Sequence, residues 1–339
     1  MSGVQQIEVR AADADIRLDR WFNRHFPGLS HGKLQKLLRK GQIRIDGGRA
    51  KASDRVVEGQ VIRVPPLDAK DSAERPPRKS HQRLSAKDKK FIQSLVLYKN
   101  KDVIAINKPA GLSVQGGTKT HRHIDGMLDG LKFGEEERPK LVHRLDRDTS
   151  GVLLLARSAR AAAKLSNAFR TRRVTKIYWA LVTGEPPIKE GIIDVPLIKA
   201  GSTAQQGREM MMPDLDEQAG AQRTKTAYEV ISSIGGELTW LALQPVTGRT
   251  HQLRAHAAAI GNPIVGDHKY GTRQDLNPAL EDRLHLHARR LDIEDRDLGS
   301  FSVEAPLPVH MKKSWDFLGL HEKDGDNIKL LSEGGPLSA

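Results

Sequence analysis

Residues 143–151 read HRLDRDTSG and run directly into the apolar stretch VLLLA at residues 152–156. The apolar stretch has the length of a fully buried strand, and the Thr-Ser-Gly turn before it marks where that strand begins. Asp146 is therefore predicted at the mouth of a buried strand. Since Arg144 and Arg147 flank it, we expect its carboxylate to stay ionised and to be available as a nucleophile or a base. An ion-paired surface turn is the alternative interpretation.

The composition excludes several classes of protein. No apolar segment is long enough to span a bilayer and the N-terminus lacks the layout of a signal peptide, so we expect a cytoplasmic protein with no membrane partner. The absence of cysteine excludes disulfides, thiolate metal sites and cysteine nucleophiles. Two short histidine pairs, His121 with His123 and His285 with His287, have no acidic ligand at metal spacing. No metal and no cofactor are expected.

The positive charge is concentrated near the N-terminus. The 339 residues, enough for two domains, carry a net charge of +13. Residues 17–55 hold eleven Lys or Arg against three Asp, so this short module alone carries +8. Because each neutralised phosphate releases condensed counterions, we expect the module to bind a polyanion. A solvated charged face on an ordinary small domain is the alternative.

Local patterns predict a small α+β unit in this module. Leu18, Trp21 and Phe22 fall at helical spacing, Ser30 is placed to cap a second helix, and Gly41 to end it. An alternating strand at residues 42–45 then leads into an Asp-Gly turn, and residues 61–64 supply another strand. We expect two short helices packed on a small sheet.

Three segments of this module resemble the S4 RNA-binding domain: RLDRW at 17–21, KLLRKG at 36–41 and IRIDG at 43–47. The resemblance implies an S4-like domain over residues 1–64 with structured RNA as its ligand. It says nothing about chemistry. The cations expected to bind RNA are Arg17, Arg20, Lys33, Lys36, Arg39 and Lys40.

The remainder of the chain divides into three parts. Residues 65–90 are rich in proline and basic residues without apolar periodicity, which predicts a linker. Residues 91–320 have the length of a catalytic domain, and residues 321–339 are expected to form a C-terminal tail. Within the long part, residues 199–222 mix Gly, Gln, Met and acidic residues with no clear period, so a mobile loop is predicted there.

The long part alternates strand and helix signals. Short apolar runs predict strands at 103–107, 175–182, 227–231 and 238–243, the last two joined across a Gly-Gly turn. Helices are predicted at 158–172, which is rich in alanine, and at 250–260, which ends at a glycine. The expected fold class is α+β, with a mixed, mostly antiparallel sheet.

Four segments together resemble the large-ribosomal-subunit RNA pseudouridine synthases that carry an S4 domain, the RluA family and within it the RluC and RluD kind. They are NKPAGLSV at 107–114, HRLD with TSG at 143–151, KIYWALVTG at 176–184, and TGRTHQLR at 247–254 with Gly266-Asp267. Any one segment would be weak. Four in the family's order, after an S4-like module, are specific.

The resemblance implies roles for four side chains. Asp146 is the catalytic carboxylate, Tyr178 faces the target uracil, and Arg254 pairs with Asp146. Bidentate geometry would explain why arginine suits that last task. Arg144 is placed in the space that an extruded uridine leaves. Alternatively, Tyr178 packs in the core as an ordinary strand residue, Arg254 forms an ion pair on a helix surface, and Arg144 contacts an RNA phosphate. Trp179 should point to the opposite side of its strand and is assigned to packing.

The implied reaction converts uridine to pseudouridine in 23S ribosomal RNA, free or in an assembling large subunit, by a monomeric enzyme without cofactor. It needs a carboxylate at the sugar and a platform for the freed base, which Asp146 and Tyr178 can supply. Asp146 can either attack C1′ or remove a sugar proton. The same chemistry on transfer RNA and a non-catalytic assembly factor are the alternatives; a glycoside hydrolase would need a second positioned carboxylic acid.

Overall fold

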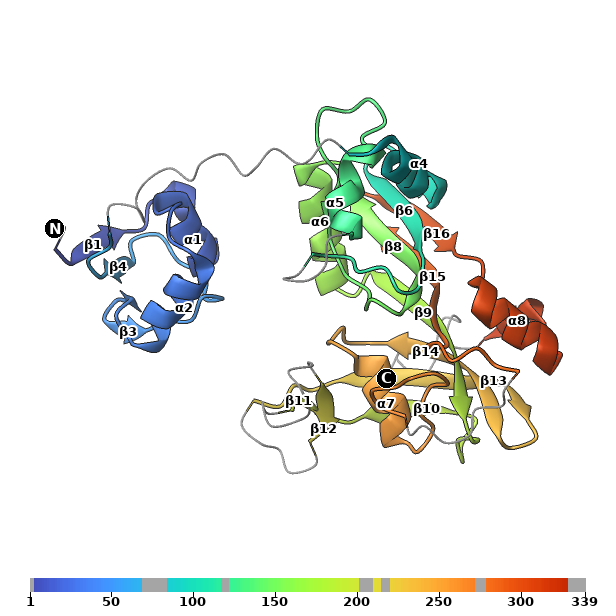
Figure 1. The fold of residues 1–339 in the computed structure, drawn as a ribbon. Helices are drawn as coiled ribbons and strands as arrows, with labels where there is room; N and C mark the ends of the chain where they lie inside the picture. Colours follow the sequence, from blue (N-terminus) through green and yellow to red (C-terminus); the bar gives the residue numbers. More distant parts are fainter. Residues whose placement is uncertain are drawn as a thin grey trace. The chain divides into compact units, whose positions relative to one another are not determined.

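The computed structural model describes residues 3–68, 84–116, 122–200, 210–214, 220–271 and 279–328. The chain forms two compact units, residues 1–83 and 84–339, each described here by itself (Figure 1). His121, residues 201–209 and 215–219 of the predicted loop, and residues 69–83 of the predicted linker lie outside the described residues.

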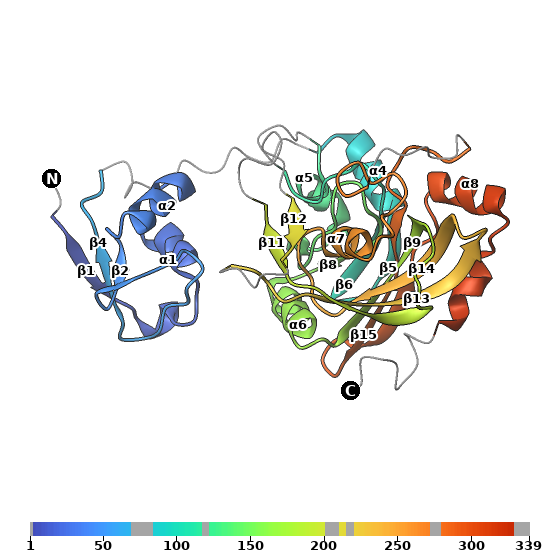
Figure 2. The ribbon, with the colours of Figure 1, turned by 90° about the horizontal axis from the view of Figure 1, so that it is seen from below.

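The first unit packs two helices on one face of a four-stranded antiparallel sheet of order β1-β4-β2-β3 (Figure 2). Its elements are β1 (Gln5–Glu8), η1 (Ala11–Asp13), α1 (Leu18–His25), α2 (His31–Arg39), β2 (Arg44–Ile45), β3 (Gly48–Arg49) and β4 (Val61–Val64). Trp21 and Phe22 of α1 and Leu34 of α2 are buried against Ile62 of β4. This apolar contact holds the unit together.

The capping and turn signals of this unit are confirmed. The Ser30 side chain accepts a hydrogen bond from the Lys33 backbone N–H, 3.2 Å away, which satisfies one free donor at the start of α2. Asp46 and Gly47 both have positive φ, at 48° and 77°, so they form the two-residue turn that joins β2 to β3. The strand β1 was not predicted, because its sequence QQIE has only one apolar residue.

The second unit is built on one large sheet of order β10-β13-β14-β9-β15-β8-β6-β5, with β16 on β15 and β7 on β8. Its strands are β5 (Val96–Lys99), β6 (Val103–Lys108), β7 (Lys140–Leu141), β8 (Ser150–Ala156), β9 (Val174–Thr183), β10 (Glu190–Asp194), β13 (Lys225–Ile234), β14 (Leu238–Pro245), β15 (Leu286–Asp295) and β16 (Gly299–Glu304). Its helices are α4 (Ala86–Ser94), α5 (Ile124–Met127), η2 (Leu128–Leu131), α6 (Ala159–Arg170), α7 (Gln252–Ala259), α8 (Val309–Leu318) and η3 (Glu322–Asn327).

Strand β8 is buried on both faces, as its continuous apolar sequence predicts. Its alternate residues Val152 and Leu154 pack with α6, while Leu153 and Leu155 pack on the other face with α4, α5 and η2 (Figure 1). The predicted helices and strands of this unit are all present, within a few residues of their expected ends. The mixed, mostly antiparallel α+β fold is confirmed.

The sheet has one parallel junction, between β8 and β15; every other strand pair in the described part of this sheet is antiparallel. At this junction Gly151 has a φ of +108°, and a Cβ there would overlap the backbone of Ala288. The Ser150 hydroxyl and His287 Nδ1 lie 2.8 Å apart across the same junction. Glycine is therefore required at the end of the Thr-Ser-Gly turn, five residues after Asp146.

Three predicted boundaries differ from the structure. Helix α4 begins at Ala86, inside the segment predicted as linker. The sequence did not predict this helix because it is rich in lysine and has Ile92 as its one buried residue, so it shows little apolar periodicity. The predicted tail contains η3, and Ile328 after it is buried in the core around Trp179 and Trp240. Part of the predicted loop forms an antiparallel pair, β11 (Leu197–Lys199) with β12 (Met211–Pro213).

Candidate active site

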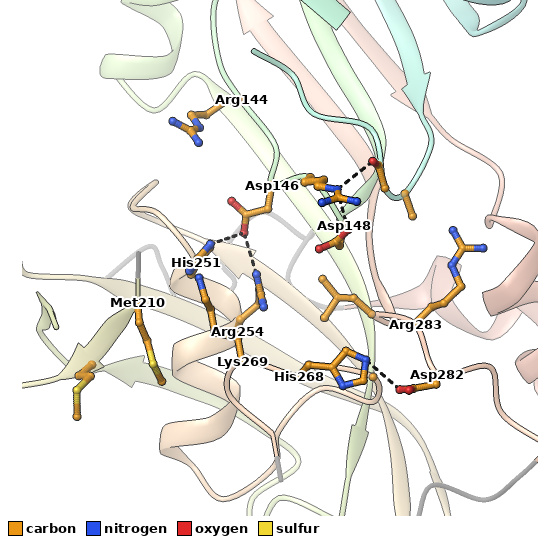
Figure 3. A pocket seen from close by; sticks show the side chains of 16 residues that line it. Arg144, Asp146, Asp148, Met210, His251, Arg254, His268, Lys269, Asp282 and Arg283 are labelled. Carbon is orange, nitrogen blue, oxygen red and sulfur yellow. Dashed lines mark hydrogen bonds and ion pairs between the residues drawn. The ribbon is translucent and has the colours of Figure 1, made fainter. Parts of the chain in front are cut away.

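Asp146 lies in the loop between β7 and β8, with 19% of its side chain exposed. Its Oδ2 atom is 3.7 Å from Arg254 Nη1 and 3.9 Å from His251 Nε2 (Figure 3). Both partners come from the start of α7, more than a hundred residues further along the chain. The carboxylate is therefore partly open to a cavity and faced on one side by two nitrogen atoms.

Arg254 is held mainly by Asp267. Its Nε and Nη2 atoms donate to the two carboxylate oxygens of Asp267, each at 2.7 Å, and the Asp267 side chain has no exposed surface. Burial lowers the pKa of Arg254, but the bonds and charge of Asp267 outweigh it and the pKa is raised. The expected bidentate pairing of Arg254 with Asp146 is thus corrected: the fork is bonded to Asp267, and only Nη1 approaches Asp146.

His251 is oriented toward Asp146 by Tyr270. The Met211 N–H donates to the Tyr270 hydroxyl at 2.9 Å, so the hydroxyl proton is available for His251 Nδ1, also at 2.9 Å. When the hydroxyl donates to Nδ1, the neutral imidazole carries its proton on Nε2, on the side of Asp146. Burial lowers the pKa of His251, and the charge of Asp146 opposes that shift. The hairpin β11–β12 is in this way linked to the site.

Tyr178 lies on β9 and lines the same cavity as Asp146. Its ring packs with apolar residues of two core clusters, including Leu286. Burial raises its pKa well above the ordinary value, and the negative charge of Asp146 adds to the shift. Trp179, on the opposite face of the strand, is fully buried against Trp240, as predicted.

Two cavities meet at Asp146. The nucleotide cavity, of about 650 Å³, contains Tyr178 in its wall, and the hairpin cavity, of about 1160 Å³, contains Met210 and Met212. Both are lined by Arg144, Asp146, His251 and Arg254. Among the described residues, Asp146 is the one carboxylate in the wall of the nucleotide cavity. The arrangement suits a polyanionic chain that passes the carboxylate with one base inserted beside it.

Lys108 is a residue of the site that sequence reasoning missed. It is fully buried, and its Nζ donates to the carbonyl oxygens of Pro109, Leu112 and Arg147 at 3.0, 2.9 and 2.9 Å. Burial lowers its pKa to about 7, while the charges of Asp148 and Asp146 oppose the shift. Lys108 therefore fastens the NKPAGL turn to the loop that carries Asp146.

The remaining predicted site residues are cations, all exposed except Lys33, which is half-buried. Arg144 is exposed and lines both cavities. In the first unit, the predicted RNA-binding side chains lie on or next to α1 and α2; Arg17 pairs with Asp19 at 2.6 Å and Lys33 with Asp68 at 2.7 Å. Arg20, Lys36, Arg39 and Lys40 are exposed as well. The structure places them in a different unit from Asp146.

Within the described ranges, no cluster of three His, Asp or Glu side chains is arranged to hold a metal ion. His285 and His287 are buried and hydrogen-bonded, to Ser314 and to Ser150 respectively. None of the described helices combines the length and apolar character of a membrane span.

A partly open carboxylate faced by arginine, in a cavity lined by cations, together with a separate small basic unit, fits an enzyme that acts on RNA. The family of RNA pseudouridylate synthases matches residues 102–259, and the S4 domain family matches residues 16–62. The chain belongs to the RNA pseudouridylate synthase family and is an isomerase that acts on RNA.

Individual relatives agree with this assignment. "RNA pseudouridine synthase 4, mitochondrial" of Arabidopsis thaliana is 34% identical, with 88% of this chain and 78% of the relative covered. "Ribosomal large subunit pseudouridine synthase C" of Rickettsia typhi is also 34% identical, with 88% and 96% covered. Among solved structures, human RNA pseudouridylate synthase domain containing 4 is 29% identical with a TM-score of 0.58, covering 69% of this chain and 98% of that one.

Proposed function

We propose that this enzyme converts specific uridines of 23S ribosomal RNA to pseudouridine, with Asp146 as its catalytic group and no cofactor. Relatives named as large-subunit enzymes and the S4 domain support ribosomal RNA as the substrate. The observation that carries the role of Asp146 is its position: it lines both cavities and lies beside Arg254 and Tyr178. The monomeric state and cytoplasmic location expected from the sequence stay predictions.

The reaction is an exchange of bonds within one nucleotide. The bond from N1 of uracil to C1′ breaks, the base turns, and a bond from C5 to C1′ forms; N1 gains a proton and C5 loses one. Asp146 can attack C1′ and be displaced by C5, or remove a sugar proton and return it. Both routes need a carboxylate at the sugar and a base held in place after the first bond breaks.

Three neighbours of Asp146 suit these needs. The ring of Tyr178 offers a surface on which the freed uracil can stack. Arg254, fixed by Asp267, directs one N–H group at the carboxylate and keeps a positive charge beside it. Arg144 stands at the entrance with a long planar side chain, suited to fill the space that the extruded uridine leaves.

The decisive variant is Asp146→Asn, which keeps the shape of the side chain and removes its charge. We expect it to bind a 23S rRNA transcript as the parent does and to form no pseudouridine in single-turnover assays. Carbodiimide labelling with primer extension reads out the product at each uridine. Turnover by the variant close to that of the parent would exclude Asp146 as the catalytic group.

The substrate class is tested by giving the parent enzyme matched transcripts of 23S rRNA and of transfer RNAs. We expect product in the 23S transcript, at the uridines that lose pseudouridine in cells lacking the gene. Product in transfer RNA alone would reject ribosomal RNA as the substrate and leave the chemistry in place.

A further inference from the structure

The nucleotide cavity holds a cation whose charge the described chain does not neutralise. Lys176 lies on β9 two residues before Tyr178, and both side chains line this cavity. Its Nζ reaches across to the loop before α7, where it is 3.9 Å from the position that a Cβ of Gly248 would take. Among the described residues, no carboxylate lies within salt-bridge distance of Lys176.

The neighbours of Lys176 make this charge costly. The side chain is half-buried, and burial lowers its pKa. The titratable group next to it is His143, whose Nε2 accepts the Leu154 N–H; burial and the charge of Lys176 lower its pKa to about 3, so the imidazole is neutral. A half-buried ammonium without a counter-ion is unfavourable unless an anionic ligand enters the cavity.

Arginine side chains line the same cavity: besides Arg144 and Arg254, they are Arg170, Arg172 and Arg249. Arg172 follows the end of α6 and is exposed, with a φ of +59°. The Arg173 N–H bonds to the Ala168 carbonyl, so Arg172 occupies the left-handed position of a Schellman turn, where glycine is favoured and arginine is strained. Arg249, in the loop before α7, is exposed as well. An arginine kept in a strained position points to a use for its charge.

Building on the proposed function, we propose that Lys176, Arg172 and Arg249 form a phosphodiester-binding site in the wall of the nucleotide cavity, which holds an RNA phosphate beside the uridine stacked on Tyr178. Lys176 and Tyr178 are about 6.6 Å apart along one face of β9, so one nucleotide can place its base on the ring and its phosphate on the ammonium. Two exposed guanidinium groups then close over the same phosphate or its neighbour.

The first test is a salt titration of binding to a labelled decauridylate by the full chain. Lys176→Met keeps the length of the side chain and removes its charge. We expect it to weaken binding about fivefold and to reduce the log–log salt slope by about 0.7, the value for one contact to a single strand. Lys312→Met, an exposed lysine of α8 outside both cavities, is the matched control and should change neither. Equal affinity and slope for Lys176→Met and the parent would overturn the proposal.

The second test separates binding from folding. Arg172→Gly removes the charge and relieves the strain, so we expect a melting temperature equal to or above that of the parent with weaker binding of the decauridylate. A decauridylate with neutral methylphosphonate linkages should bind the parent, Lys176→Met and Arg172→Gly equally, because it carries no charge for these cations to bind. A loss of affinity as large for the neutral probe as for the phosphodiester would show a structural effect and reject the site.

Turnover distinguishes this proposal from the function on which it depends. In single-turnover assays with a 23S transcript, the RNA concentration for half-maximal rate should rise for Lys176→Met by about the fivefold expected for its loss of binding. If the parent itself isomerised no 23S transcript, the proposed substrate would fail while the salt slopes still reported on the phosphate site. A lower saturating rate for Lys176→Met with unchanged affinity would reject a role in phosphate binding.

Discussion

The cations of the two units differ in how they are held. In the first unit they lie on exposed parts of α1 and α2, where Arg17, for example, has 45% of its side chain accessible. In the second unit Arg254 and Lys108 are buried and hydrogen-bonded: Arg254 donates to both carboxylate oxygens of Asp267, and Lys108 donates to three backbone carbonyl oxygens. Exposed cations attract any phosphate chain, whereas buried and bonded cations set the geometry of one carboxylate. Charge alone therefore does not predict what a basic residue does here.

The strongest test of this contrast is Arg254→Lys, which keeps the charge and loses the fork. Lysine cannot bond both oxygens of Asp267 and also face Asp146, so we expect the single-turnover rate to fall about a hundredfold or more, as for loss of one preorganised donor. Affinity for RNA should change little. A lysine variant as fast as the parent would show that charge is sufficient and would remove the contrast.

The next test compares one buried and one exposed lysine. Lys108→Met leaves three carbonyl oxygens without their donor, and we expect it to reduce the free energy of unfolding by about 2–3 kcal/mol. Lys36→Met should leave the melting temperature unchanged and reduce only the salt slope for RNA binding. Chemical denaturation of both variants measures the difference. Equal stability of the two would mean that the buried ammonium does not support the loop of Asp146.

A pH titration probes the buried junction beneath the active site. His287 is neutral in the folded protein, with its pKa lowered to about 4 by burial, whereas the unfolded chain has a value of about 6.5. The unfolded state therefore takes up this proton first as pH falls. The contribution of His287 to the free energy of unfolding is full above pH 6.5 and decreases toward pH 4, by about 2 kcal/mol at pH 5. Denaturant unfolding at pH 7.5 and 5 measures this. The decrease in the free energy of unfolding between pH 7.5 and 5 should be smaller in His287→Gln than in the parent. An equal decrease in the two proteins would show that other groups cause it.

The smallest expected effect is on chemistry when residues 1–64 are deleted. The second unit contains Asp146, Tyr178 and Arg254, so the rate at saturating RNA should stay within about threefold of the parent. The log–log salt slope of RNA binding should fall by about 0.7–0.9 for each phosphate contact that is lost. Single-turnover rates and salt titrations of both proteins give the two numbers. An unchanged slope would show that the first unit does not bind RNA, and a lost saturating rate in a folded truncation would show that it helps to form the active site.

Local sequence was enough for several of the elements and for the position of Asp146, the proposed catalytic carboxylate. The VLLLA run predicted a strand buried on both faces, Ser30 a helix cap, and the Asp-Gly pair a two-residue turn, because each depends on neighbours within a few residues. The placement of Asp146 at a strand mouth needed no more than the turn before that strand. Helix α4 and η3 were not predicted because they have few apolar residues. Those residues are recognised as buried only once the core that they cover is known.

Tertiary structure alone decided how the site is assembled. Through the turn at Gly266 it pairs Arg254 with Asp267, and it orients His251 through Tyr270. It also places no carboxylate of the described residues within salt-bridge distance of Lys176. The contacts of Asp146 with His251 and Arg254 join segments that are far apart in the chain, as does the contact of Ser150 with His287, 137 residues away, at the parallel junction. The sequence by itself determines which side chains can carry charge, stack or cap, because those are local properties. Which of them meet is determined by the packing of β8, β9, β15 and α7, because a hydrogen bond depends on distances of a few ångströms that no local pattern encodes.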